Sequence, residues 1–236
     1  MSHPNSLKPS TLVISVGGSL VVPNGGIDHV FLKDFKHMVT KHVKKGWRFV
    51  IVVGGGGTAR AYQEASRKVG KLTRDDLDWL GIHSTRLNGH LVRTILRDLA
   101  HPVMIKDPTS KFKHWEKPIL VAAGWKPGWS TDYVATYLAK RLKSPLVVNL
   151  SNIDYVYDKD PRKHEDAEVI CHISWEEFRK MVGNEWDPGM NVPYDPVASR
   201  LAHHSGINVA ILNGKNMKNL DSLLKGDRFI GTMIGN

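Results

Sequence analysis

The sequence predicts an α/β protein, a three-layer αβα sandwich with a mainly parallel central sheet. Three observations support this fold class. Short apolar, β-branched segments alternate along the 236 residues with longer segments whose apolar residues recur at helical spacing. The short segments are almost continuously apolar, as in strands that are covered on both faces. Glycine-rich turns follow two of them and lead into helices, which is typical of parallel strand–loop–helix units.

The first quarter of the chain contains two such units. We expect strands at residues 11–16 and 47–53, a helix from residue 27 to Gly46, and another helix from residue 58 onward. Gly17-Gly18-Ser19 follows the first strand, and four glycines, residues 54–57, follow the second. Glycine lets the backbone approach a phosphate closely, so two such loops at one edge of a parallel sheet predict a ligand crevice.

A long helix is predicted for residues 75–100. We expect its recurring leucines and isoleucines on the buried side: Leu77, Leu80, Ile82, Leu87, Leu91, Ile95 and Leu99. Asp78 and Arg86 are its notable polar residues. For Asp78, an exposed helix surface and a contact to a ligand hydroxyl are equally compatible with the sequence. A further strand is expected at residues 101–105.

A loop rich in glycine, proline and hydroxyl side chains separates a buried strand at residues 118–123 from a helix at residues 133–139. The loop reads Gly-Trp-Lys-Pro-Gly-Trp-Ser-Thr-Asp over residues 124–132. It would present backbone N–H groups, Ser130, Thr131 and the positive end of the helix dipole toward an anion. The sequence therefore predicts a phosphate-binding site at this loop.

The remaining chain continues the alternation. We expect strands at residues 144–150 and 206–212, helices at residues 175–181, 195–205 and 217–224, and an edge strand at residues 231–234. The polar segment 151–161 carries two tyrosines and several aspartates, which suits a loop that flanks a purine; a plain hairpin with an Asp-Pro turn is the alternative. Without a repeat or an obvious linker, the chain is expected to form a single domain over residues 1–236.

Composition narrows the class of protein. The formal net charge of +10 favours anionic partners, although the basic residues are spread along the chain and are compatible with a solvated surface. The single cysteine, Cys171, can form neither an intramolecular disulfide nor a thiolate metal site, and we expect it to be buried. No apolar segment of about 18 residues or signal-peptide pattern occurs, so a soluble, cytoplasmic protein is expected.

Several common motifs do not fit. The chain lacks the P-loop pattern. Gly54, Gly56 and Ala59 match a dinucleotide-binding pattern, but the required second strand with an acidic end does not follow about 20 residues later. The histidines lack His-Glu-x-x-His spacing, and the sequence lacks an RNA-recognition signature. Zinc chemistry and a nucleic-acid partner are therefore not expected.

Taken in order, six segments resemble the amino acid kinase superfamily and, within it, the archaeal-type uridylate (UMP) kinases. They are VGGS at residues 16–19, VGGG at 53–56 with Ala59-Arg60, GIHSTRLN at 81–88, PGWSTD at 127–132, NIDYVYDKDP at 152–161 and DPVA at 195–198. The resemblance implies ATP-dependent phosphorylation of UMP to UDP with Mg²⁺, in pyrimidine nucleotide biosynthesis. It also implies a cytoplasmic homo-oligomer, usually a hexamer, with no membrane partner. The acceptor-binding half would span about residues 1–116 and the ATP-binding half about 117–236.

The resemblance also implies roles for individual residues. The ATP site would contain Gly18, Ser19, Gly56 and Arg60 at the phosphates, and Ser151, Tyr157 and Asp160 at the adenosine. The UMP site would contain Gly55, Asp78 at the ribose, and Trp125, Lys126, Pro127, Gly128, Trp129, Ser130 and Thr131 around the base and phosphate. Asp132 would organise hydrogen bonds and cations near the transferred group, and no residue is assigned as a protein ligand of a metal.

The chain departs from the superfamily pattern in its cations. Many members carry a lysine at the position of Ser15 and another on the strand near Asn149. Archaeal-type UMP kinases also tend to lack the first lysine. Arg60 or Lys126 could take its place, and with Asp132 they are the catalytic candidates.

The loop over residues 124–132, called the acceptor loop below, and the segment 151–161 also depart from the pattern. Trp125 and Trp129 are bulkier than the residues common there, and Tyr155 stands where glycine is usual. Two alternatives therefore stay open. One is a kinase of the same superfamily with another acceptor, such as a different phosphate, a carboxylate or a carbamate. The other is a non-catalytic member that binds a nucleotide or an oxyanion, similar to the molybdenum storage proteins.

Overall fold

A mainly parallel sheet forms the centre of the molecule. The computed structural model describes residues 10–24, 26–111, 115–183, 185 and 192–236, and these form a seven-stranded sheet with the order β3-β2-β1-β4-β8-β9-β7. In that order the strands are β3 (Ile119–Ala122), β2 (Arg48–Val53), β1 (Thr11–Val16), β4 (Leu146–Ser151), β8 (Asn208–Asn213), β9 (Thr232–Gly235) and β7 (His172–Ser174). The first five run parallel, whereas β9 pairs antiparallel with β8 and parallel with β7.

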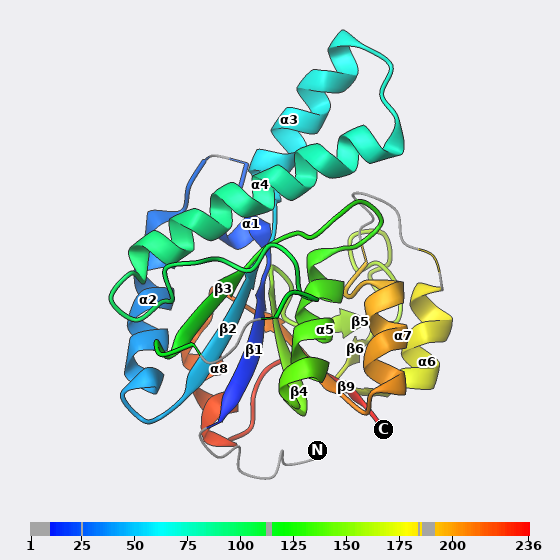
Figure 1. Cartoon of the computed structure of the whole chain (residues 1–236). Helices are drawn as coiled ribbons and strands as arrows, with labels where there is room; N and C mark the ends of the chain where they lie inside the picture. Colours follow the sequence, from blue (N-terminus) through cyan, green and yellow to red (C-terminus); the bar gives the residue numbers. More distant parts are fainter. Residues whose placement is uncertain (1–9, 25, 112–114, 184, 186–191) are drawn as a thin grey trace.

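Helices cover both faces of this sheet. The helices of the described residues are α1 (Gly18–Val21), α2 (His29–Val43), α3 (Gly56–Val69), α4 (Arg74–Ile95), α5 (Thr131–Leu142), α6 (Trp175–Val182), α7 (Pro196–His204) and α8 (Met217–Lys225), and all but α3 contribute to the layers. Alternate residues of β1 belong to two apolar clusters: Leu12 and Ile14 to the one that includes α2, α8 and the end of α4, and Val13 to the one that includes α5, α6 and α7. Figure 1 shows these helices on the two faces of the sheet. The predicted αβα sandwich is confirmed.

Two helices extend beyond the sandwich as an arm, which we define as α3 and the first half of α4 (Figure 1). The residues of α3 are all at least partly exposed, including Tyr62 at 60% and Val69 at 90%. The arm is held together internally, because Gln63 Nε2 on α3 donates to the Leu77 carbonyl on α4 at 2.8 Å. Thr73 and Asp76 form a capping box that begins α4. The arm joins the body where α3 begins and where α4 continues into its second half, and Asp78 adds a hydrogen bond to the body.

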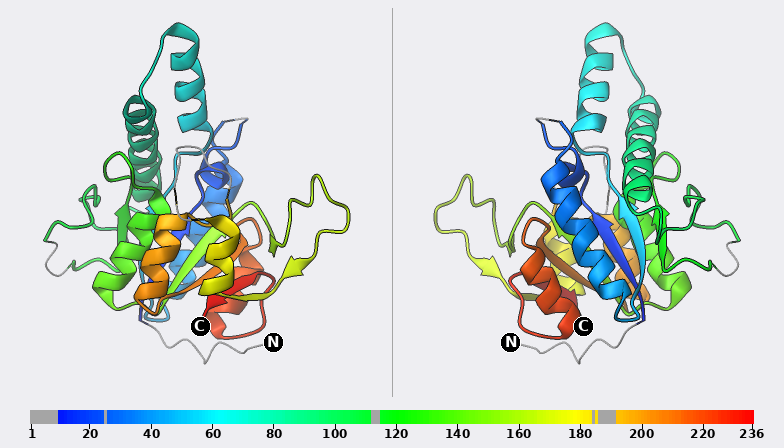
Figure 2. Two further views of the ribbon diagram at one scale, coloured as in Figure 1. Left: turned by 90° about the vertical axis from the view of Figure 1, so that its right-hand side faces the viewer. Right: turned by 90° about the vertical axis from the view of Figure 1, so that its left-hand side faces the viewer.

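Two sequence expectations about secondary structure are wrong, and for segment 151–161 the structure contains a hairpin, which the sequence analysis leaves open as the alternative. Residues 101–105 form no strand; Ala100 and Ile105 make isolated bridges beside β3, and Val103 between them is 67% exposed. β9 lies between β8 and β7 rather than at an edge. The segment 151–161 enters a short antiparallel hairpin of β5 (Val156–Tyr157) and β6 (Val169–Ile170), and Figure 2 shows their connection extending from the body.

Two expectations about burial are also wrong. Cys171 is exposed instead of buried. Leu87, expected inside, is 62% exposed, because the buried side of α4 carries polar residues where it crosses the loops at the sheet edge. Among the described residues, no helix combines the length and the apolar composition that crossing a membrane requires.

Candidate active site

The two predicted glycine loops interlock at the carboxyl ends of β1 and β2. A Cβ atom added to Gly18 would lie 2.1 Å from the Gly56 nitrogen, and one added to Gly56 would lie 2.1 Å from the Gly18 oxygen. Gly56 also has a φ of +57°, which favours glycine. Asn88 on α4 donates from Nδ2 to the carbonyl oxygens of Gly54 and Gly55, each at 2.9 Å. Only glycine allows this close crossing, and it is anchored from α4.

A cavity of about 230 Å³ lies between the start of α3, the middle of α4 and the loop after β3. Seven predicted site residues line it: Gly55, Gly56, Arg60, Asp78, Trp129, Ser130 and Thr131. Six further residues that the site predictions did not include complete the lining: Ala59, Gln63, Gly81, Ile82, Thr85 and Gly124. The sequence therefore predicted residues from all three walls of one cavity, although they are up to 76 positions apart, from 55 to 131.

Arg60 connects the two glycine loops. Its guanidinium donates to Ser19 Oγ at 3.2 Å and to Asn24 Oδ1 at 3.0 Å, while the residue also lines the cavity. The Arg60 cation is thereby held beside the cavity that the backbone N–H groups at the start of α3 also face. This is the arrangement expected for binding phosphate groups.

Asp78 is buried, so its alternative as an exposed helix residue is wrong. The residue is 7% exposed and its Oδ2 accepts a hydrogen bond from the Gly128 backbone N–H at 2.7 Å. Burial raises the pKa of the Asp78 carboxyl, and the Gly128 contact partly offsets that shift. Asp78 therefore both lines the cavity and holds the loop over residues 124–132.

A row of neighbouring aromatic rings runs from the loop over residues 124–132 along α5. Ring centroids are separated by 5.8 Å from Trp125 to Trp129, 4.1 Å from Trp129 to Tyr133 and 6.1 Å from Tyr133 to Tyr137. Lys126 Nζ lies 4.3 Å from the Trp125 ring centroid, and neither of these two residues lines the cavity. Of this row, Trp129 is the ring that a ligand in the cavity would contact.

Asp132 occupies an unusual electrostatic position. Part of the residue is exposed, but its carboxyl group is withdrawn from water and accepts a hydrogen bond from Ser15 Oγ at 3.1 Å. Desolvation, followed by the negative charge of the buried Asp195, raises its pKa to about 7. Ser15 pairs with Asn149 across β1 and β4, so the position that resembles one superfamily lysine site neighbours the part of β4 near the other. In this chain a hydroxyl contacts Asp132 instead.

This pKa predicts how stability depends on pH. The ordinary Asp pKa of 3.8 rises to about 7 on folding, so between those values the folded protein binds the additional proton and its free energy of unfolding falls as pH rises. Each pKa unit corresponds to about 1.4 kcal/mol. We expect Asp132→Asn to be more stable than the wild type at pH 8 without ligands, and to lose this advantage near pH 4. Thermal unfolding of both proteins over this range measures the difference; parallel curves would contradict the shifted pKa.

The residues assigned to adenosine lie apart from the cavity lining. Ser151 ends β4, and Tyr157 belongs to β5. Asp160 follows in the connection to β6, where the Arg162 guanidinium donates to both carboxylate oxygens at 3.0 Å and holds the Asp160 pKa well below its usual range. Among the described residues, no group of three or more His, Cys, Asp or Glu side chains is arranged to hold a metal ion.

The sequence analysis assigned no role in the site to the side chains of Ser15, Thr85 and Asn88. A signal for them exists, because each is a polar residue on a strand or helix face that is otherwise expected to be apolar. Ser15 stands in a run of buried β-branched residues, and Thr85 and Asn88 lie three positions apart on the buried side of α4.

Comparisons with known proteins agree with this geometry. The model of the Amino acid kinase family matches residues 10–213. Uridylate kinases from Hyperthermus butylicus and Methanocorpusculum labreanum are each 34% identical, over 94% and 95% of this chain and 97% and 95% of theirs. The crystal structure of uridylate kinase from Archaeoglobus fulgidus superposes with a TM-score of 0.80 at 27% identity, covering 95% of this chain and 99% of that one. The predicted resemblance is confirmed, and the chain belongs to the amino acid kinase family.

Proposed function

We propose that this protein transfers the γ-phosphoryl group of ATP to UMP, giving ADP and UDP, and thereby serves pyrimidine nucleotide biosynthesis. The observation that carries the proposal is the cavity itself. It combines a buried carboxylate for ribose hydroxyls, Asp78, with an aromatic wall, Trp129, and with Arg60 and Thr131 for phosphate. The similarity to uridylate kinases over almost the whole chain supports the same acceptor.

The proposed reaction is a direct in-line displacement. An oxygen of the UMP phosphate attacks the γ-phosphorus, the bond from this phosphorus to the β–γ bridging oxygen breaks, and ADP leaves with that electron pair. The attacking oxygen is already ionised, so no general base and no covalent intermediate are needed. The protein contributes positioning and neutralisation of charge on the transferred group. Backbone N–H groups at the starts of α3 and α5 and the Arg60 guanidinium are suited to that task.

For ATP, the proposal assigns the phosphates to Gly18, Ser19, Gly56 and Arg60. Ser151, Tyr157 and Asp160 would hold the adenosine, with Asp160 exchanging its Arg162 contact for a ribose hydroxyl. The ATP-binding half would start near residue 117 and the acceptor half would end near residue 116. The acceptor cavity nevertheless draws Trp129, Ser130 and Thr131 from the second half.

The donor set fits Mg²⁺ that is held mainly by nucleotide phosphates. Mg²⁺ is usually bound through one or two carboxylates together with substrate phosphates. Asp132 and Asp195 are two neighbouring carboxyl groups whose pKa values are raised by burial, so a divalent cation beside them would favour their charged forms. When bound, Mg²⁺ would supply further neutralisation of phosphate charge. Asp132, with Arg60 and Lys126 as cations, is the proposed catalytic set.

We also propose a cytoplasmic homo-oligomer, a hexamer by the family resemblance, without a nucleic-acid or membrane partner. The arm supports an association surface, because α3 has no fully buried residue. Tyr62, Val69 and Trp79 are exposed apolar side chains on this arm. Light scattering after size-exclusion chromatography measures the mass; a monomer at micromolar concentration would contradict the oligomer.

The decisive test of function is an assay coupled to ADP formation, with ATP and a panel of acceptors: UMP, CMP, acetylglutamate and carbamate. UDP formation from UMP alone is expected. Turnover of another acceptor would assign a different kinase of the family. ATP binding without turnover of any acceptor would instead favour the non-catalytic alternative.

Substitution of Asp78 tests the acceptor site. Asp78→Ala is expected to raise the Michaelis constant for UMP by at least about tenfold, the usual order for a lost hydrogen bond to a charged group. The Michaelis constant for ATP should stay near its wild-type value. Asp78→Asn serves as the matched variant, since its amide oxygen still accepts from Gly128 and it should retain more of the affinity. An unchanged Michaelis constant for UMP in Asp78→Ala would remove Asp78 from the acceptor site.

A further inference from the structure

Two adjacent side chains of α4 hold the two main-chain polar groups of one residue, Gly124, in the loop over residues 124–132. The Gly124 N–H donates to Thr85 Oγ1 at 2.8 Å, and the Gly124 carbonyl accepts from Arg86 Nε at 3.3 Å. Arg86 Nη2 donates in addition to the Trp125 carbonyl at 2.8 Å. Thr85 Oγ1 itself donates to the Ile82 carbonyl at 2.6 Å, which fixes the hydroxyl as an acceptor for Gly124. The first two residues of the loop, Gly124 and Trp125, are thus hydrogen-bonded to α4.

The far end of the same segment is fastened to the same helix. Asp78 accepts from the Gly128 N–H at 2.7 Å and lies seven residues, two helical turns, before Thr85. Gly124 packs closely against the helix, because an added Cβ would lie 2.8 Å from Thr85 Oγ1. The loop over residues 124–128 is therefore spanned by α4, and Trp129 of the cavity wall follows immediately.

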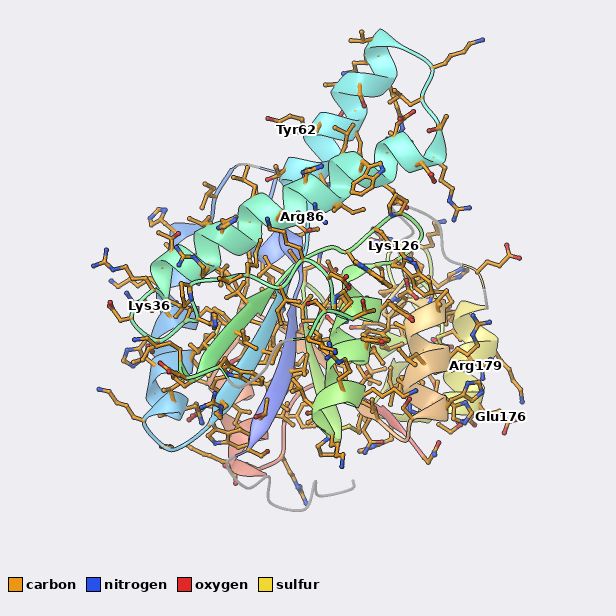
Figure 3. All side chains as sticks on the ribbon, in the orientation of Figure 1. Lys36, Tyr62, Arg86, Lys126, Glu176 and Arg179 are labelled. Atoms are coloured by element: carbon orange, nitrogen blue, oxygen red, sulfur yellow. The ribbon has the colours of Figure 1, made fainter. Side chains whose placement is uncertain are left out.

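Arg86 is suited to this position by its shape. Its planar guanidinium presents several N–H donors in a fixed fork, which can serve two successive carbonyl oxygens at once. Lysine would offer a single ammonium on a flexible stem. Arg86 is half-buried at the junction of the arm and the body (Figure 3), and desolvation lowers its pKa. Its two loop contacts are main-chain oxygens, so it acts on the loop independently of the loop's side chains.

We propose that Arg86 is a positioning residue for the phosphoryl acceptor, which sets the loop over residues 124–128 so that Trp129 and Thr131 face UMP. This inference rests on the proposed UMP kinase function. It predicts an effect confined to the acceptor, because Arg86 contacts the segment that leads into the acceptor wall. The residues assigned to adenosine lie on β4 and the β5–β6 hairpin instead.

Steady-state kinetics test the proposal. Arg86→Lys and Arg86→Met are compared with Arg97→Met, which removes an exposed arginine just beyond α4. We expect both Arg86 variants to raise the Michaelis constant for UMP by at least about tenfold and to leave that for ATP within about twofold, with Arg97→Met unchanged. A purely structural defect would lower the active fraction, and hence kcat, while leaving both Michaelis constants unchanged. That outcome, or full retention of UMP affinity by Arg86→Lys, would overturn the proposal.

A double-mutant cycle adds a second readout. Thr85→Val removes the hydroxyl that accepts from the Gly124 N–H, one peptide group before the Gly124 carbonyl that Arg86 holds. If both side chains act by fixing Gly124, their effects on the Michaelis constant for UMP are non-additive. Strictly additive effects would contradict a shared role.

Hydrogen exchange separates failure of this inference from failure of the proposed function. In the ligand-free protein, the Gly124 and Gly128 amides are bonded to Thr85 and Asp78 and should exchange slowly. We expect Arg86→Met to accelerate exchange in the peptide containing residues 124–128, while Arg97→Met leaves it unchanged. Unaltered exchange would contradict the positioning of the loop by Arg86 even if the wild type phosphorylates UMP. Accelerated exchange in a protein that does not turn over UMP would support the positioning role and contradict UMP as the acceptor.

Discussion

Asp132→Asn is expected to lower kcat by about a thousandfold, the order found when one preorganised electrostatic contact to a transferred group is lost. The substitution keeps the shape of the side chain and removes the negative charge that would align cations with the transferring phosphoryl group. The fold should persist, because Thr136 Oγ1 and Tyr194 Oη bond the Asp132 main-chain carbonyl, at 2.9 and 3.4 Å, rather than its carboxylate. Single-turnover kinetics with saturating ATP and UMP measure the chemical step.

Asp98→Asn is the matched control for Asp132→Asn, since the Asp98 side chain is 84% exposed and lies beyond the end of α4. It should retain the wild-type rate. Circular dichroism and thermal unfolding establish that both variants are folded. A folded Asp132→Asn enzyme with a rate close to that of the wild type would refute the role given to Asp132.

Gly18→Ala is expected to destabilise the folded protein by about 3 kcal/mol or more, because overpacking against rigid backbone has costs of this order. The added methyl group would meet the Gly56 nitrogen at 2.1 Å and the Gly54 carbonyl carbon at 2.5 Å, and neither is a flexible side-chain end that can move away. For a chain of this size the change corresponds to a fall in melting temperature of about 6–12 °C. ATP affinity should fall as well, since both glycine loops must separate to admit the methyl group.

Gly70→Ala provides the control for this prediction. Gly70 ends α3 with a φ of −158°, and an added Cβ would meet no heavy atom within 4 Å. Its melting temperature should therefore match that of the wild type within about 2 °C. Equal melting temperatures for Gly18→Ala and Gly70→Ala would contradict the prediction, because the two glycine loops would then separate without loss of folding stability.

Much of the fold could be predicted because the central strands are locally unambiguous. The strands at residues 11–16 and 47–53 are confirmed at the predicted bounds within one residue, since β-branched runs between glycine turns fit a sheet covered on both faces. The order of β9 and the bridges at Ala100 and Ile105 could not be predicted, because strand neighbours depend on contacts distant in sequence.

The site could be predicted where the backbone requires glycine. It could not be predicted where side chains distant in the sequence contact each other. Gly18 and Gly56 are indicated by local turn chemistry. The bond from Ser15 to Asp132 joins residues 117 positions apart, and that from Gly124 to Thr85 joins residues 39 apart. The face of α4 was misjudged because its leucines suggested an apolar contact, whereas the helix packs on loop backbone whose N–H and C=O groups need polar partners.

The position of the arm matters for any partner that binds it. Its two helices contribute Arg60 and Asp78 to opposite walls of the cavity, and α3 continues to Val69, about 20 Å from its first residue at 1.5 Å per residue. The hydrogen bond from Gln63 to Leu77 joins the two helices, and Asp78 also accepts from the Gly128 N–H. A partner bound at the tip of the arm would therefore contact the same two helices that supply the cation and the carboxylate of the cavity.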